Sequence, residues 1–187
     1  MKVLINIFLA AVILISCSTP PNQKQNGDEK PAVDSIPAVK KTDNIPTTLI
    51  DGYKVAGDSL EIPSFEIQVQ LSDRAEQKLK AMKESIIVTA YFSGNPKNKK
   101  LISEDGQFPV ASGSVELTVS RVANIQGIKI SKANFEQLTD KDIQVLINIY
   151  SGRRSTQDNL LDCDILEKQI SQIKGQRSIL KGKLIGE

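Results

Sequence analysis

Stretches in which apolar and polar residues alternate recur through residues 60–187, and they limit the folds open to this chain. In 64–71 (SFEIQVQL) the apolar residues fall on one side and the Glu and Gln residues on the other, as in a strand buried on one face. Gly, Asn, Pro and Asp separate such stretches, as in turns. About seven short strands predict an all-β domain with antiparallel sheets packed as a sandwich. The other predicted strands are 85–93, 114–122, 125–130, 142–150, 160–166, 177–185 and a short one at 101–103.

Two stretches have helical spacing instead. Over 73–82, apolar residues recur at i, i+4 and i+7 from Ala75, and Ser72 can cap the first turn. A second helical pattern covers 132–138. Helices this few and short exclude a repeating β-α-β fold.

The residues that lead into the strand at 142–150 (LTDKD, from Leu138) resemble the corner between strands E and F of immunoglobulin-like and fibronectin type III domains. The resemblance implies an immunoglobulin-like antiparallel β-sandwich of about seven strands with one or two short helices. Ile143 stands near the place of the corner tyrosine, and the Cys pair and core Trp of antibody domains are missing. Transthyretin-like and lipocalin-like topologies therefore remain alternatives.

Residues 1–16 (MKVLINIFLAAVILIS) have the form of a secretory signal, with Lys2 ahead of a short apolar stretch. The stretch is too short for a membrane span, which needs about 20 apolar residues. The sequence LISC, ending at Cys17, resembles the lipobox of bacterial lipoproteins. In that class a signal peptidase cuts before the cysteine, the sulfur carries a diacylglyceryl group, and the new amino group receives a fatty acid such as palmitate. The resemblance implies lipidation of Cys17.

The lipobox resemblance also implies a location. We expect a protein anchored to the cell envelope by lipid, without spanning a membrane, on the periplasmic face of the outer membrane. The inner membrane stays an alternative, and so does an ordinary secretion signal in which Cys17 is incidental.

The predicted organisation has three parts: a lipoprotein signal peptide at 1–16, a lipid-anchored flexible linker at 17–59, and the β-sandwich domain at 60–187. The linker holds five of the eight prolines and is rich in Asn, Gln, Lys and Asp. Such a segment cannot bury enough apolar surface to offset the entropy lost on ordering. A hairpin around Asp51 and Gly52 is expected at its end.

The charged and catalytic residue types exclude several classes of function. The chain has no His, and its 24 Lys and Arg nearly balance 22 Asp and Glu, for a net charge of +2. Without His there is no Ser-His-Asp or Cys-His catalysis and no His-based zinc site. Basic residues interspersed among acidic ones leave no broad positive face for nucleic acid. We therefore expect no enzyme, no metal, no cofactor and no nucleic-acid partner.

The loop 151–159 (SGRRSTQDN) is the most polar stretch between two apolar strands. The forked donors of Arg153 and Arg154 can grip a carboxylate or phosphate, and Ser155 and Asn159 can orient it. These four residues are the predicted ligand-binding or partner-binding residues. The alternative is an ordinary solvated loop.

Paired acidic residues offer two further hypotheses. Carboxylates that converge at one end of the sandwich can bind calcium. Two carboxylates that face a cleft can also serve as the acid and nucleophile of a glycosidase. The candidates are Asp140, Asp142, Asp162, Asp164, Glu104 and Asp105.

Two single residues complete the predictions. Strand alternation at 161–165 points Cys163 into the core, together with Leu161 and Ile165. Asn148 interrupts an apolar strand, so we expect its amide to satisfy an internal backbone group.

The function that follows is a cell-envelope lipoprotein that presents its β-sandwich as a non-catalytic binding or adaptor module. Its partners would be the membrane, through the lipid anchor, and an envelope protein or glycan. A carboxylate-dependent envelope enzyme acting on glycans, or a passive structural subunit of an envelope assembly, are the alternatives.

Overall fold

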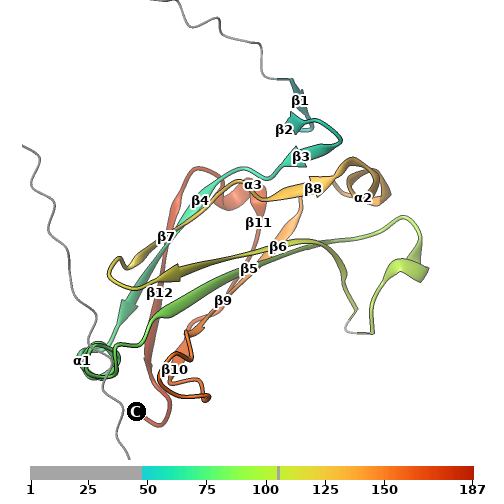
Figure 1. Ribbon diagram of the computed structural model, residues 1–187. Helices are drawn as coiled ribbons and strands as arrows, with labels where there is room; N and C mark the ends of the chain where they lie inside the picture. The colour runs from blue at the N-terminus through green and yellow to red at the C-terminus, as the bar shows by residue number, and fades with distance from the viewer. Residues whose placement is uncertain (1–47, 105) are drawn as a thin grey trace, which may run out of the picture. The chain divides into compact units, whose positions relative to one another are not determined.

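The structure, a computed structural model, describes residues 48–104 and 106–187. Strands dominate these residues and form three four-stranded sheets, with few short helices (Figure 1). The predicted all-β, sandwich-like domain is therefore confirmed. The signal peptide, Cys17 and most of the predicted linker lie outside the described residues.

The strands are distributed over sheets A, B and C as follows. Sheet A has the order β1 (Leu49–Ile50), β2 (Tyr53–Ala56), β3 (Ser59–Glu61) and β8 (Lys129–Ser131). Sheet B has the order β10 (Leu161–Cys163), β12 (Arg177–Leu184), β4 (Phe65–Leu71) and β7 (Val122–Ile125). Sheet C has the order β11 (Leu166–Gln169), β9 (Gln144–Ser151), β5 (Ile86–Gly94) and β6 (Phe108–Leu117). One pair departs from the predicted antiparallel arrangement, since β12 and β4 run parallel.

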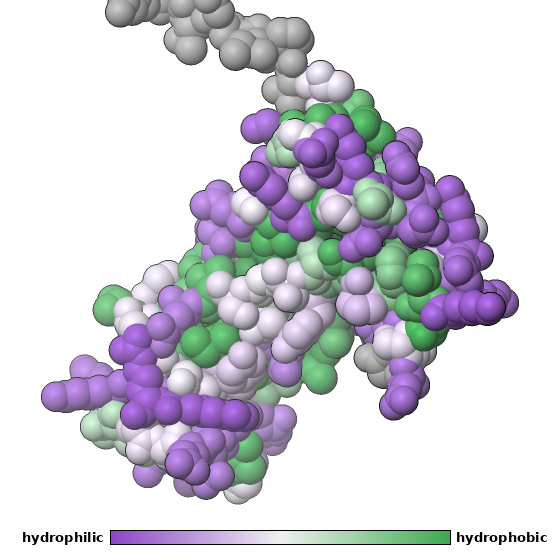
Figure 2. Space-filling view, turned by 45° about the vertical axis from the view of Figure 1, so that its right-hand side comes forward, coloured by the Kyte–Doolittle hydropathy of each residue, from purple (hydrophilic) through white to green (hydrophobic). Residues whose placement is uncertain are grey.

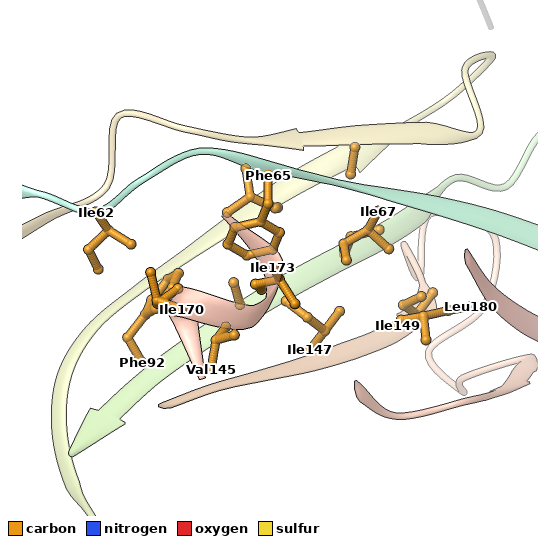
Figure 3. Close-up of a cluster of buried hydrophobic side chains, with 14 of the residues drawn as sticks. Ile62, Phe65, Ile67, Phe92, Val145, Ile147, Ile149, Ile170, Ile173 and Leu180 are labelled. Carbon is orange, nitrogen blue, oxygen red and sulfur yellow. The ribbon is translucent and has the colours of Figure 1, made fainter. Parts of the chain in front are cut away.

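The main core lies between sheets B and C. Phe65 of β4 and Phe92 of β5 meet edge to face, with ring centroids 6.4 Å apart. Figure 3 shows Ile147 of β9 in the same cluster, together with Ile170 and Ile173 of the short helix α3 (Ile170–Ile173). Burial of each such side chain stabilises the fold by about 1.5–3 kcal/mol. The cluster also fixes which faces of the two sheets are left to solvent.

Helix α1 (Asp73–Met82) has the predicted bounds. The Ser72 hydroxyl accepts a hydrogen bond from the Ala75 N–H at 3.2 Å, as a helix cap should. The helix ends at Lys83, whose φ of 53° is left-handed, and the chain then passes through Glu84 into β5. The second predicted helix is α2 (Lys132–Gln137).

Three predicted strands are each divided. The strand predicted at 125–130 is the last residue of β7 and the start of β8, separated by a bend at Gly127, whose φ is 69°. The strand predicted at 114–122 is the end of β6 and the start of β7, joined by a turn in which the Val122 N–H donates to the Ser120 hydroxyl at 3.0 Å. The strand predicted at 160–166 is β10 and the start of β11. Between them Ile165 is 67% exposed rather than inward, because the Asp164 carboxylate accepts from the Lys181 N–H and ends the pairing with β12.

The short strand predicted at 101–103 is wrong. Its first residue ends a 3₁₀ turn, η1 (Lys99–Leu101). The Asn98 side chain accepts from the Lys100 N–H at 3.0 Å and sets the turn. A local side-chain bond of this kind competes with strand pairing.

Residues 48–59, expected as linker, are part of the folded domain. The hairpin predicted around Asp51 and Gly52 is confirmed, and both residues have the positive φ that a two-residue hairpin turn requires. Tyr53 is only 4% exposed, and its hydroxyl donates to the Lys141 carbonyl at 2.9 Å. Burial raises the pKa of Tyr53 to about 12. A tyrosine from β2 therefore reaches the corner where the sequence has Ile143.

No helix in the ranges 48–104 and 106–187 is both long and apolar enough to cross a membrane.

Candidate functional site

The predicted binding loop folds back onto Glu84, a buried carboxylate between α1 and β5. Glu84 is 7% exposed. Its Oε1 accepts from the backbone N–H groups of Ser85 at 2.9 Å and Arg154 at 3.0 Å. Its Oε2 accepts from the N–H and the hydroxyl of Ser155, at 2.9 and 2.8 Å. Both carboxylate oxygens are therefore satisfied by the protein itself.

The four hydrogen bonds to Glu84 also determine the pKa of its carboxyl group. Burial would raise the pKa of this carboxyl group, because the charged form loses its hydration. The hydrogen bonds from Ser155, Arg154 and Ser85 outweigh that cost and lower the pKa to about 2. Glu84 is a fixed anion that holds the loop, and it is too acidic to serve as a proton donor near neutral pH.

Arg154 is also engaged through its guanidinium. Its Nε donates to Glu116 Oε1 at 2.8 Å, and the Ser85 hydroxyl donates to the same oxygen at 2.6 Å. The bond to Arg154 is the main reason that the pKa of Glu116 is lowered. The guanidinium thus joins the end of β6 to the loop.

The other two predicted residues lie apart from Glu84. Asn159 Oδ1 accepts from the Ser151 and Leu161 N–H groups, and its amide donates to the Leu161 carbonyl at 2.7 Å. Arg153 has a φ of 56° and places its guanidinium 5.9 Å from the centre of the Tyr150 ring. The structure therefore does not gather the four residues around one open space, and three of them bond within the protein.

Four of the acidic residues considered for calcium or catalysis, Asp140, Asp142, Asp162 and Asp164, are bonded locally, and Asp105 lies outside the described residues. Asp140 accepts from the Asp142 N–H at 2.9 Å, and the Asp142 carboxylate accepts from the N–H and hydroxyl of Ser171. Asp162 lies 3.9 Å from the Lys183 ammonium. In the described part of the chain, no three His, Cys, Asp or Glu residues are grouped to hold a metal.

Cys163 lies half-buried at the end of β10, packed against the core. Its thiol touches the backbone of β12, since a side chain at Gly182 would overlap the Cys163 sulfur. Burial, aided by the charges of Asp162 and Asp164, raises the pKa of the thiol to about 11. A thiol with so little thiolate at neutral pH is a poor nucleophile.

A groove of about 540 Å³ lies between α1 and the turn that joins β6 to β7. Two arginines line it, and both are paired. Arg121 donates through Nε and Nη2 to the Glu76 carboxylate at 2.8 and 2.7 Å, and Arg154 is bonded to Glu116. The Val119 side chain at its border is 89% exposed. Lys80, Lys83 and the apolar residue Leu79 also line the groove.

The outer face of sheet C has a different composition. The pairing register puts Tyr91 of β5 beside Ser112 of β6 and Leu146 of β9, and Thr89 beside Ser114 and Asn148. Thr89 joins this row through bonds to the hydroxyls of Ser114 at 2.8 Å and Tyr150 at 3.2 Å. The face is thus made of hydroxyl, amide and aromatic groups.

Charge is almost absent from this outer face. Among its described residues on β5, β9 and the end of β6 only Glu116 is charged, and it is held by Arg154. On the opposite edge Glu167 of β11 accepts from the Gln144 amide. Figure 2 shows residues of intermediate hydropathy, drawn pale, across the middle of one face of the domain, with hydrophilic residues in purple toward its ends.

The outer face of sheet B differs from that of sheet C in its charged residues. It carries the charged side chains of Arg177, Lys181 and Lys183 on β12, and Arg177 pairs with Glu66 of β4 at 2.7 Å. Charged residues are the usual covering of a solvent-facing sheet. Sheet C lacks that covering.

Asn148 lies on this face, and the expectation that its amide satisfies an internal backbone group is wrong. Its side chain is exposed on β9, and it bonds to no residue that the structure describes, so it satisfies no internal backbone group. Sequence alternation contained the signal, because Gln144, Leu146, Asn148 and Tyr150 all fall on the side away from Ile147.

Comparison of the chain with protein-family models, with curated proteins and with solved structures gives no match.

Proposed function

We propose that this chain is a lipid-anchored protein of the bacterial cell envelope whose β-sandwich works as a non-catalytic binding module. The observation that carries the proposal is the outer face of sheet C, which has few charged residues and carries polar groups of Tyr91, Ser112 and Asn148 that bond to no described residue. A sheet that faces only water gains solubility from charged side chains, as on sheet B. A face without them is suited to a partner that covers it.

The state of the carboxylates favours binding over catalysis. A glycosidase needs two carboxyl groups that converge on an open cleft, with one free to donate a proton. Glu84 is enclosed by four donors, and Glu116 is held by Arg154 and Ser85. The Asp142 carboxylate accepts hydrogen bonds from the N–H and hydroxyl of Ser171. Each is used in holding a loop or turn.

The anchoring part of the proposal rests on the lipobox resemblance at LISC, ending in Cys17. Two or three acyl chains give a durable membrane anchor, since each buried CH₂ contributes about 0.8 kcal/mol. The proline-rich segment after Cys17 would let the domain stand away from the bilayer.

Replacing Cys17 with serine should move the protein from the membrane fraction to the soluble fraction, because serine cannot take up the thioether-linked lipid. The measurement is fractionation of expressing cells together with the intact mass of the purified chain. Cys163→Ser is the matched control and should stay in the membrane with its lipid mass. A Cys17→Ser protein that still partitions with membranes would contradict the anchor.

The binding face can be tested with charge-introducing changes at exposed positions. The full chain carrying Ser112→Glu and Asn148→Glu should lose envelope components that the unchanged chain retains on an affinity matrix, because two desolvated charges would face the partner. The control is Gln70→Glu on the exposed face of β4. Equal retention by both variants and the unchanged chain would show that this face is not the binding surface.

A further inference from the structure

We infer that the outer face of sheet C binds a neutral oligosaccharide, in a groove centred on Tyr91. The inference rests on the proposed binding function and names the ligand class for that face. The groove has a volume of about 530 Å³. None of its lining residues is charged, although charged residues make up 25% of the chain. The lining includes Tyr91, Ser112, Gln107, Pro109, Ala111 and Leu146.

The Tyr91 ring supplies an apolar platform in the groove. Its side chain is 43% exposed in the middle of β5, where the neighbouring inward residues are fully buried. Ser112 and Leu146 are its direct partners on the two adjacent strands, at a strand spacing of about 4.8 Å. A flat ring with one polar end suits a ligand that has an apolar C–H face and a hydroxyl rim, which is the chemistry of a pyranose ring.

The polar groups beside the ring are free to bond a ligand. The hydroxyls of Tyr91 and Ser112 and the amide of Asn148 make no hydrogen bond to the residues in the ranges 48–104 and 106–187. Hydroxyl and amide groups both donate and accept, as sugar hydroxyls do. A hydroxyl-rich ligand can replace the water that it displaces from them, whereas an apolar surface would leave them unsatisfied.

The charges that border the face favour a neutral ligand over an acidic one. Glu116 lies at one end of the face and Glu167 on the β11 side, and both are carboxylates. The one cation beside Glu116, Arg154, is already bonded to it. Arg153 lies at the edge of the same face, with its guanidinium 5.9 Å from the centre of the Tyr150 ring, but it does not line the groove. An acidic sugar or a phosphate in the groove would therefore meet no cation among the residues that line it.

The same composition disfavours a protein partner at this groove. The centre of a protein interface is depleted in Ser and is built on apolar and aromatic anchors that fill pockets. Here one exposed aromatic ring stands beside Ser112, Gln107 and the small apolar surface of Pro109, Ala111 and Leu146. The face matches a polar, extended ligand more closely than an apolar one.

The test is calorimetric titration of the full chain, in detergent micelles, with cellohexaose, chitohexaose, mannohexaose and the acidic hexamer of galacturonate. We expect binding of at least one neutral hexamer and none of the acidic hexamer. Tyr91→Ala should weaken that binding by about tenfold or more, as expected on removing an aromatic contact. Ile179→Ala is the matched control, since Ile179 is 57% exposed on β12 of the other sheet and should leave binding unchanged.

Thermal unfolding of Tyr91→Ala shows whether the variant folds, and Asn148→Asp provides a second variant that should weaken binding through charge. Binding of a neutral hexamer that both variants leave unchanged would overturn the inference, as would preference for the acidic hexamer. If no neutral hexamer binds while the Ser112→Glu, Asn148→Glu chain still loses a captured protein, the inference fails and the proposed binding function stands. If neither binding is seen, both fail.

Discussion

Replacing Glu84 with alanine is expected to lower the free energy of unfolding by about 3 kcal/mol at pH 7. The carboxylate accepts four hydrogen bonds, from Ser85, Arg154 and Ser155. Their loss leaves backbone N–H groups of a part-buried loop without an acceptor, and each unsatisfied group costs about 1–3 kcal/mol. Chemical denaturation followed by circular dichroism measures the change.

The contribution of Glu84 should depend on pH in a direction that its pKa sets. The pKa in the folded protein is about 2, below the ordinary value of 4.5. A carboxyl group whose pKa is depressed on folding stabilises the fold fully above its unfolded pKa, and loses that contribution as the pH falls toward the folded value. The advantage of the unchanged protein over Glu84→Gln, which cannot titrate there, should therefore be largest above pH 4.5 and shrink toward pH 2.

Glu116→Gln is the matched control for Glu84. Glu116 also bonds to Ser85 and Arg154, but its side chain is 41% exposed. Exposed ion pairs contribute little to stability, so this variant should unfold close to the unchanged protein. An equal loss of unfolding free energy in Glu84→Gln and Glu116→Gln would contradict the larger contribution expected from the four hydrogen bonds to Glu84.

Sequence periodicity was sufficient for the parts of the fold that depend on local pattern. The alternation at 64–71 correctly placed Phe65 inward, and a capping serine with spaced apolar residues located α1. Strand direction is set by contacts distant in sequence, so the parallel pairing of β12 with β4 left no local trace. The hairpin at Asp51 was visible because its turn needs particular residues.

The site was less predictable because its bonds join distant segments. Nothing near Glu84 in the sequence indicates that the loop 70 residues later encloses it. Arg154 and Ser155 were therefore predicted to be available to a ligand. The outer face of sheet C was detectable from the polar residues that alternate along β9, including Asn148. The exposure of Asn148 was missed because its amide was expected to satisfy an internal backbone group.

Replacing Gly152 with alanine should destabilise the same region by about 2 kcal/mol, the usual cost of overpacking. Gly152 donates its N–H to the Ser85 carbonyl at 2.8 Å, so the two backbones approach closely. A Cβ at Gly152 would overlap the Ser85 hydroxyl oxygen and lie 3.2 Å from Glu84 Oε1. The φ of Gly152 is not positive, so overlap rather than backbone strain causes the loss.

Ser85→Ala tests that cause, because it removes the overlapped oxygen. In the Ser85→Ala background the Gly152→Ala change should cost about 1 kcal/mol less than it does alone, a coupling typical of residues in contact. Chemical denaturation of the unchanged protein, the two single variants and the double variant gives the four free energies of unfolding that this double-mutant cycle needs. Additive losses would place the cost of the alanine elsewhere than at the Ser85 hydroxyl. A coupling of the expected sign would show that the start of β5 and the loop after β9 pack as one unit around Glu84, which leaves the outer face of sheet C free to bind.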